Sequence, residues 1–177
     1  MRVVAGKYRG KKLKEFDLNS TRPTLDRVKE AIFSSIQFDI INAKVLDLFS
    51  GTGALGIEAI SRGAKLTYFV DSNYEAQKII KENLKNVSEA FEVVKADFQT
   101  FLMEKKSQQF DIIFLDPPYA TDYAEKAIQF ILSNNMLSDK GVIVWEKSND
   151  KNIPEFENLN IKTKKYGTVQ VVYLRKN

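Results

Sequence analysis

From residue 44 to residue 146, apolar stretches of strand length alternate with stretches of helical periodicity. The helical stretches carry apolar side chains every three or four positions, as at Ala76, Ile80 and Leu84. Strands that alternate with helices predict a mostly parallel sheet covered on both faces. The chain is therefore expected to form a doubly wound α/β fold. The expected strands are 44–49, 65–70, 91–95, 111–115 and 141–146.

Both ends of the chain depart from this alternation. The last 18 residues predict two strands that meet near Gly167, an antiparallel hairpin at one edge of the sheet. At the other end, residues 2–5 and 12–16 predict the strands of a small basic hairpin or arm, and a helix is expected to begin near Pro23.

The domain organisation is expected to be simple. The length of 177 residues fits one domain, and no repeat or low-complexity linker marks a second one. We expect a single domain over 1–177, with the basic arm and a helix in 1–43 and the α/β core in 44–177.

The sequence contains no Cys and no His. Their absence excludes Ser-His-Asp and Cys-His triads, disulfides and imidazole or thiolate metal sites, and no metal is expected. Catalysis must use carboxylates, hydroxyls, backbone groups or a bound cofactor. No apolar run exceeds four residues, so neither a membrane span nor a signal peptide is expected. The predicted location is the cytoplasm.

Positive charge is concentrated at the two ends. Residues 1–14 carry six basic side chains and residues 160–177 carry five, and neither segment contains an acid. Residues 15–159 contain the other 16 basic residues and all 23 acidic ones, so this body of the protein has a negative net charge. The ends could bind a polyanion locally, or their charges could simply solvate terminal hairpins; composition does not separate the two interpretations.

The first expected strand leads into a glycine loop with the spacing Gly51-x-Gly53-x-x-Gly56, and the next strand ends at Asp71. This spacing matches the dinucleotide fingerprint, so a nicotinamide enzyme is the first hypothesis. Asp47 argues against it, because its carboxylate would repel a pyrophosphate. S-adenosylmethionine suits the acid better, since it carries sulfonium and ammonium charges and no phosphate. The glycines would let the backbone approach this ligand, and Asp71 would accept its ribose hydroxyls.

The third expected strand is followed by Asp97 and Phe98. The Asp97 carboxylate could accept the amino group of an adenine, with Phe98 against the ring. A helix cap is an equally good interpretation of Asp97 and is compatible with the first.

The fourth expected strand ends in Asp116-Pro117-Pro118-Tyr119. An exocyclic amine of a nucleobase is a poor nucleophile, because its lone pair is delocalised into the ring. Two acceptors, the Asp116 carboxylate and the Pro117 carbonyl, could take both amine protons and direct the lone pair at a methyl donor. Tyr119 offers an aromatic face for a flipped base. A plain turn after a strand is the alternative.

These motifs together resemble a known family, the RsmD-type ribosomal RNA guanine-N2 methyltransferases. The resemblance extends over nearly the whole chain and includes the basic N-terminal segment. The motifs that carry it are Arg9-Gly10-Lys11-Lys12-Leu13, Arg22-Pro23-Thr24, Asp26-Arg27, Asp47-x-Phe49-x-Gly51-Thr52-Gly53 and Asp116-Pro117-Pro118-Tyr119.

The resemblance implies a Rossmann-like class I methyltransferase with S-adenosylmethionine as donor and S-adenosylhomocysteine as product. It implies a guanine of 16S ribosomal RNA as target, guanine 966 in the family. The partner would be that RNA or a small-subunit assembly particle, with no membrane, and we expect a monomer. The implied catalytic residues are Asp116, Pro117, Pro118 and Tyr119. The donor-binding set is Asp47, Phe49, Gly51, Gly53, Asp71, Asp97, Phe98, Arg22 and Thr24. The RNA-binding set is Lys7, Arg9, Lys11, Lys12 and Arg27.

Three alternatives stay open at this point. A DNA adenine-N6 methyltransferase shares the tetrapeptide but usually needs a target-recognition domain, for which only the first 43 residues are available. A protein-amine methyltransferase could use a related tetrapeptide, although the basic ends favour nucleic acid. A non-catalytic RNA-binding module would have no need for Asp47 and Asp116.

Overall fold

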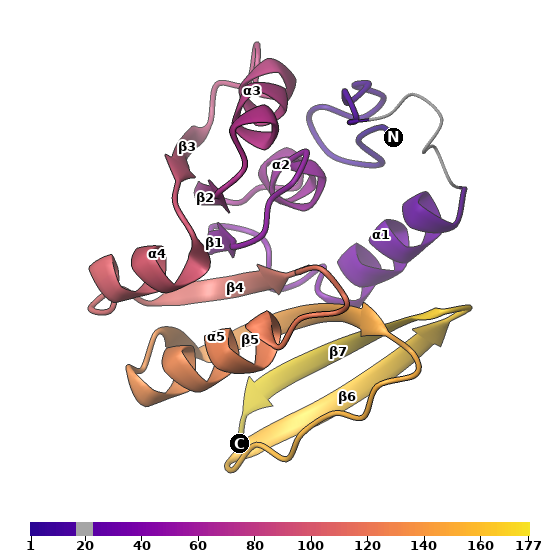
Figure 1. Ribbon diagram of the computed structural model, residues 1–177. Coiled ribbons are helices and arrows are strands. Elements are labelled where there is room, and N and C mark those ends of the chain that lie inside the picture. Colours follow the sequence, from indigo (N-terminus) through magenta and orange to yellow (C-terminus); the bar gives the residue numbers. More distant parts are fainter. Residues whose placement is uncertain (17–22) are drawn as a thin grey trace.

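The computed structural model describes residues 1–16 and 23–177, with the side chains of 23–25 excepted. Its centre is a seven-stranded sheet in the order β3-β2-β1-β4-β5-β7-β6 (Figure 1). The first five strands of this order are parallel, and β7 runs antiparallel to both β5 and β6. The strands are β1 (Lys44–Asp47), β2 (Leu66–Asp71), β3 (Ala90–Lys95), β4 (Phe110–Leu115), β5 (Leu137–Ser148), β6 (Leu159–Tyr166) and β7 (Val169–Lys176).

Helices cover both faces of the sheet, as the alternating pattern predicts. Helices α4 and α5 pack with one face in a cluster that includes Phe101 and Ile128. Helices α1, α2 and α3 supply Ile32, Ile57 and Ile80 to clusters on the other face. None of the described helices is long and apolar enough to cross a membrane. The helices are α1 (Pro23–Ser35), α2 (Ala54–Ser61), α3 (Tyr74–Asn83), α4 (Phe98–Glu104) and α5 (Tyr123–Ser133).

The expected core elements are confirmed, with shifts at their ends. β1 stops at Asp47, two residues early, because the chain turns there into the glycine loop. β5 begins at Leu137 rather than at residue 141 and continues to Ser148, since it pairs with β4 on one side and β7 on the other. The C-terminal hairpin turns at Gly167, which has a φ of 60°.

The prediction of two strands in the N-terminal arm (residues 1–16) is wrong. One antiparallel bridge, between Arg2 and Lys12, is the only strand-like pairing in the described part of the arm. The backbone donates to α2 instead: the N–H groups of Val4 and Ala5 bond to the Glu58 carboxylate at 2.9 and 3.1 Å. These donors are therefore not available for a longer strand ladder.

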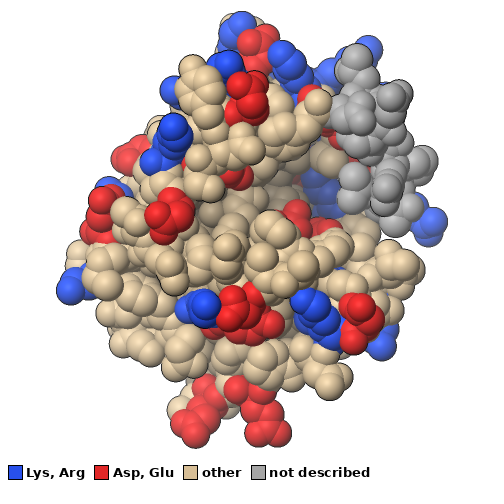
Figure 2. Space-filling model, viewed as in Figure 1, with Lys and Arg blue, Asp and Glu red and all other residues tan. Residues whose placement is uncertain are grey.

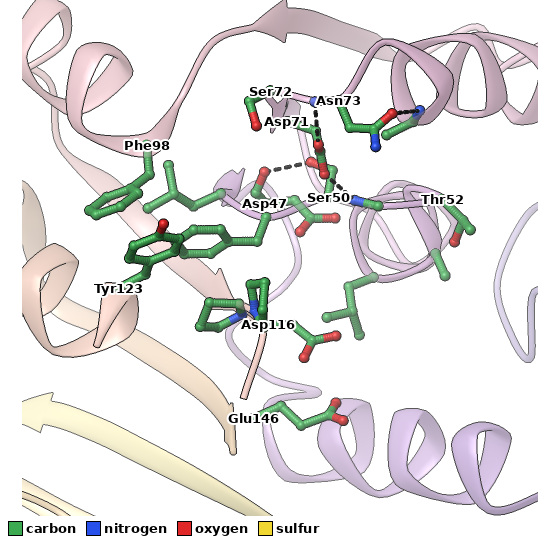
Figure 3. A pocket seen from close by; sticks show the side chains of 18 of the residues that line it. Asp47, Ser50, Thr52, Asp71, Ser72, Asn73, Phe98, Asp116, Tyr123 and Glu146 are labelled. Atoms are coloured by element: carbon green, nitrogen blue, oxygen red, sulfur yellow. Dashed lines mark hydrogen bonds between the residues drawn. The ribbon is translucent and has the colours of Figure 1, made fainter. Parts of the chain in front are cut away.

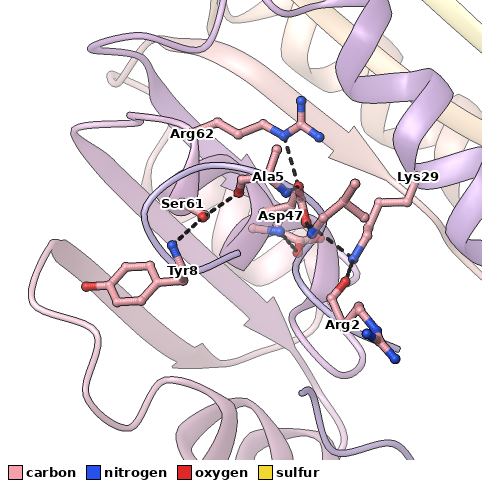
Figure 4. A network of polar contacts seen from close by, with 10 residues as sticks. Arg2, Ala5, Tyr8, Lys29, Asp47, Ser61 and Arg62 are labelled. Carbon is pink, nitrogen blue, oxygen red and sulfur yellow. Dashed lines mark hydrogen bonds and ion pairs between the residues drawn. The ribbon is translucent and has the colours of Figure 1, made fainter. Parts of the chain in front are cut away.

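Glu58 is buried in α2 and binds charged or polar groups of the arm and α1. Figure 4 shows Arg2, Lys29 and Arg62 of the network around it. Lys29 of α1 lies 3.3 Å from one carboxylate oxygen, and Arg62 lies 2.9 Å from the other. The Lys29 ammonium also donates to the Arg2 carbonyl. Glu58 and Lys29 are 0% and 3% exposed, so each charge depends on the other and on the arm for compensation.

Replacing Glu58 with Ala should therefore destabilise the protein strongly. The change leaves the Lys29 ammonium buried without its carboxylate and removes the acceptor for two arm N–H groups, which we expect to cost about 3–5 kcal/mol. Denaturant unfolding measures the loss, and limited proteolysis should show cleavage in the arm before the core. Glu75→Ala is the control, because it breaks only the exposed pair with Lys78. Equal, small effects of the two variants would contradict this assignment.

Candidate active site

A cavity of about 790 Å³ opens at the carboxyl ends of the parallel strands. Its volume is typical of small-molecule sites, about 300–1,000 Å³. It lies where the strand order reverses, since β1 and β4 are neighbours while the chain leaves them toward different faces. Loops after β1, β2, β3 and β4 line it, together with Glu146 of β5 (Figure 3).

The glycine loop after β1 has the backbone that its sequence predicts. Gly51 and Gly53 have φ values of 55° and 82°, a region that favours glycine, and Gly53 caps the start of α2. Gly56 is required for a different reason: a Cβ there would lie 2.4 Å from the Phe69 ring. The Asn83 amide donates to the Thr52 carbonyl at 2.9 Å and fixes the loop against α3.

Asp47 is buried at the end of β1, where it lines the cavity. Its carboxylate accepts the N–H of Gly56 at 3.0 Å, which joins the strand to the first turn of α2. Burial raises the pKa of Asp47 to about 7, the Gly56 hydrogen bond opposes that rise, and the charge of Asp71 adds to it. Asp47 is thus an acid whose charged form would be favoured by a cation in the cavity.

Asp71 connects the glycine loop to the turn after β2. One oxygen accepts the Gly51 N–H at 2.9 Å, and the other accepts the Asn73 N–H at 2.9 Å. Each carboxylate oxygen has a further lone pair, so Asp71 can still accept hydroxyl groups from a ligand in the cavity.

Three aromatic side chains form one wall of the cavity (Figure 3). The Phe98 ring lies 5.4 Å from Phe49 and 5.1 Å from Tyr123, between ring centroids. Tyr123 is not among the predicted site residues. No local motif marks it, because only the packing of α5 brings its ring to Phe49 and Phe98.

Asp97 caps α4, as one of its two interpretations predicts. Its carboxylate accepts the N–H of Thr100 at 2.9 Å and the hydroxyl of the same residue at 2.8 Å, and these bonds lower its pKa. Asp97 also lines the cavity beside Phe98. The role toward an adenine stays a prediction.

The tetrapeptide Asp116–Tyr119 follows β4 and lines the cavity. The Pro118 carbonyl is occupied, since it accepts the N–H and the hydroxyl of Thr121 at 3.1 and 2.7 Å. Within the described residues no donor reaches the Pro117 carbonyl, which leaves it available as the acceptor that the sequence predicts. Tyr119 is 43% exposed and presents its ring at the cavity.

Glu146 was not predicted as a site residue. The Tyr119 hydroxyl donates a hydrogen bond to the Glu146 carboxylate at 3.0 Å. Asp116 is accessible from the cavity, but the protein around it limits its hydration and raises its pKa, with further contributions from the charges of Glu146 and Asp47. Burial also raises the pKa of Glu146, against the Tyr119 hydrogen bond. Of the carboxyl groups that line the cavity, Asp47, Asp116 and Glu146 therefore have raised pKa values, and the charges of Asp47 and Glu146 oppose the ionisation of Asp116.

The predicted RNA-binding residues differ in their surroundings. Lys7 pairs with Glu89 at 2.7 Å, and Lys11 donates to the Lys85 carbonyl at 2.7 Å, so both are engaged with the segment around α3. Arg9 and Lys12 are exposed and make no side-chain hydrogen bond or ion pair with the described part of the chain.

The remaining predicted residues are Arg27, Arg22 and Thr24. Arg27 is exposed on α1. Arg22 and the side chain of Thr24 lie outside the described residues. Figure 2 shows basic side chains intermixed with acidic ones at the top of the hollowed face, where α3 lies. The ends of the arm reach the cavity itself, since Met1 and Phe16 line it.

Comparison with known proteins agrees with this geometry. Residues 1–175 match the family described as conserved hypothetical protein 95. The chain is 38% identical to ribosomal RNA small subunit methyltransferase D of Haemophilus influenzae, over 89% of this chain and 84% of that protein. It is 32% identical to the protein of the same name from Escherichia coli, over 87% and 78%. The chain belongs to the RsmD family of methyltransferases.

Solved structures confirm the class I fold. The Escherichia coli methyltransferase YhhF superposes with a TM-score of 0.86 at 31% identity, over 99% of this chain and 98% of that one. A more distant protein of the same fold, SMU.776, was solved in complex with S-adenosylhomocysteine (TM-score 0.63, 18% identity, 80% of this chain and 48% of that one). The cofactor of this family member is S-adenosylmethionine, as the sequence predicts. The buried acid, the glycine cradle and the aromatic wall fit such a donor.

The raised pKa of Asp47 gives a stability prediction with a definite sign. Between pH 4 and pH 7 the folded chain keeps the Asp47 proton while the unfolded chain has lost it, so this group lowers stability as pH rises, by about 4 kcal/mol at most. Asp47→Asn removes the cost and should be more stable than the unmodified protein at pH 8, by about 1–4 kcal/mol, with no difference at pH 4. Denaturant unfolding at both pH values checks this. A variant that is less stable at pH 8 would refute it.

Proposed function

We propose that this protein transfers a methyl group from S-adenosylmethionine to the exocyclic N2 amine of a guanine in 16S ribosomal RNA. The observation that carries the proposal is the pairing of two acceptors, the Asp116 carboxylate and the open Pro117 carbonyl, in the same cavity as the glycine loop. The names of the two relatives support ribosomal RNA as the substrate class.

The donor is assigned to the half of the cavity built by β1, β2 and β3. Asp47 would hold its positive charge, Gly51 and Gly53 would let the backbone approach it, and Asp71 would accept its ribose hydroxyls. Phe49, Phe98 and Tyr123 offer flat surfaces for its adenine. When bound, the donor supplies an electrophilic methyl group on a sulfonium.

The target base is assigned to the half of the cavity built by β4 and β5. Asp116 and the Pro117 carbonyl accept the two amine protons, which localises the nitrogen lone pair and orients it. Because its pKa is raised, the Asp116 carboxylate is a better acceptor for the departing proton than an ordinary aspartate. The exposed ring of Tyr119 stacks on the base.

The substrate assay compares three acceptors with a radiolabelled methyl donor: 16S RNA, immature small-subunit particles and DNA. We expect label in the RNA or the particle, in a nucleoside that co-migrates with N2-methylguanosine, at the family's target position. Label in DNA, or in adenosine, would overturn the proposal.

Asp116→Asn should separate chemistry from donor binding. The amide keeps the shape of the side chain but loses the charge and one acceptor oxygen, so we expect turnover to fall on the order of 10²-fold while donor affinity stays within a few-fold. Turnover is measured with saturating RNA, and donor affinity by calorimetry. The matched control is Asp122→Asn, an exposed acid on the same loop that pairs only with Lys126, and it should retain full turnover. Equal turnover of the two variants would exclude the assigned role of Asp116.

The arm makes a second prediction about substrate binding. Arg9→Ala combined with Lys12→Ala removes two exposed charges, and each lost phosphate contact should reduce the slope of log K against log salt by about 0.7–0.9. The melting temperature should not change, because both side chains are exposed and make no hydrogen bond or ion pair with the described part of the chain. Lys7→Ala combined with Lys11→Ala is the comparison variant of equal charge, whose side chains are already engaged. An unchanged salt slope in the Arg9 and Lys12 variant would show that the arm does not bind phosphates there.

A further inference from the structure

We propose that Glu146 is the residue that selects guanine, by accepting the N1–H of the target base beside the amine held by Asp116. This inference rests on the proposed function and names a specificity determinant for it. It starts from a side chain that the sequence motifs do not include.

The sheet register places Glu146 beside the tetrapeptide. β4 and β5 are parallel neighbours, and Leu115 pairs with Trp145, so Asp116 and Glu146 are the next residues along the two strands. Both side chains line the cavity, and Figure 3 shows Asp116 and Glu146 as neighbours in this part of it. Two carboxyl groups are thus held side by side on the base half of the cavity.

One hydrogen bond holds the Glu146 carboxylate beside the tetrapeptide. Its Oε1 accepts the Tyr119 hydroxyl at 3.0 Å, which ties it to the ring proposed to stack on the base. The next residue, the buried Lys147, donates to the Ser148 and Lys151 carbonyls, and Lys151 donates to the Tyr119 carbonyl. The segment after β5 therefore fixes Glu146 and the tetrapeptide relative to each other.

No cation balances this acid pair in the described residues. The ion pairs found there include neither Asp116 nor Glu146, although both lie in surroundings that disfavour an isolated charge. A neutral acceptor would bind the Tyr119 hydroxyl at a lower desolvation cost than a carboxylate. The hydrogen bond to Tyr119 therefore does not by itself explain an acid at position 146. Clustered acids of this kind are typical of functional sites.

The Watson–Crick edge of guanine matches two neighbouring acceptors. It presents the N1–H and the N2 amine side by side, and both are donors. Adenine presents a donor amine next to an N1 lone pair, which would face the Glu146 carboxylate and leave both groups without a partner. A polar site that leaves such groups unpaired discriminates strongly against the wrong base. Glu146 would in this way exclude the base that a similar tetrapeptide serves in DNA adenine methyltransferases.

The test replaces the target guanine with 2-aminopurine, which keeps the 2-amine but carries a lone pair at N1. The substrate is the RNA or particle that the first assay identifies, and kcat/KM is measured for both bases. We expect the unmodified enzyme to prefer guanine by about 10²-fold or more. Glu146→Gln should reduce that preference at least tenfold, because its amide can still accept the Tyr119 hydroxyl while its N–H can donate to N1 of 2-aminopurine.

Two further variants separate the effect of the Glu146 carboxylate on base preference from a general loss of activity. Glu146→Asp retains a carboxylate and should still prefer guanine, even where its stability or its rate is reduced. Tyr119→Phe removes the hydrogen bond to Glu146 and should lower the rates for both bases alike. The missing O6 of 2-aminopurine affects every variant equally and cancels in the comparison of ratios.

The possible results separate this inference from the proposed function. A guanine preference that is the same in the Gln variant and the unmodified enzyme overturns the role of Glu146, even if guanine is methylated at N2. Failure of the unmodified enzyme to methylate guanine overturns the proposed function itself. A preference lost in Gln and kept in Asp supports the assignment and is not explained by a merely structural role.

Discussion

The site depends on one constraint of the sheet: β1 and β4 are parallel neighbours whose connections leave toward opposite faces. β1 continues into α2 on one face, and β4 leads to α5 on the other. A space must open between the diverging loops, and the register places Asp47 opposite Phe114, two residues before Asp116. The topology of the sheet therefore places the donor half of the cavity next to the base half, whatever side chains line them.

The chemistry of the site conflicts with the stability of the fold. Asp47, Asp116 and Glu146 are acids with pKa values raised by desolvation in one cavity, and the charges of Asp47 and Glu146 raise the pKa of Asp116 further. A structure selected only for stability would replace them with neutral groups. Ligands with complementary groups offset the cost: a cationic donor at Asp47, and hydrogen-bond donors on a base at Asp116 and Glu146.

The sequence allowed the fold and the motif residues to be predicted because their signals are local. The apolar run before Asp116 and the glycine spacing at 51–56 report strand, turn and helix directly. Glu146 and Tyr123 could not be found in this way, because only strand pairing and helix packing bring them to the cavity. The two strands predicted in the arm do not form for the same reason: Glu58, more than fifty positions away, accepts backbone N–H groups of the arm.

The same contact makes the arm part of the active site. Lys29 bonds to the Arg2 carbonyl and to Glu58, and it lines the cavity together with Met1 and Phe16. Because Val3 and Leu13 are buried against α2, the arm is held by its backbone and its apolar side chains. Arg9 and Lys12 can therefore face outward without weakening its attachment. The arm thus borders the cavity beside the glycine loop, where Phe16 is the side chain nearest to a Cβ added at Gly51, so a polyanion bound by Arg9 and Lys12 would lie on the donor side of the cavity.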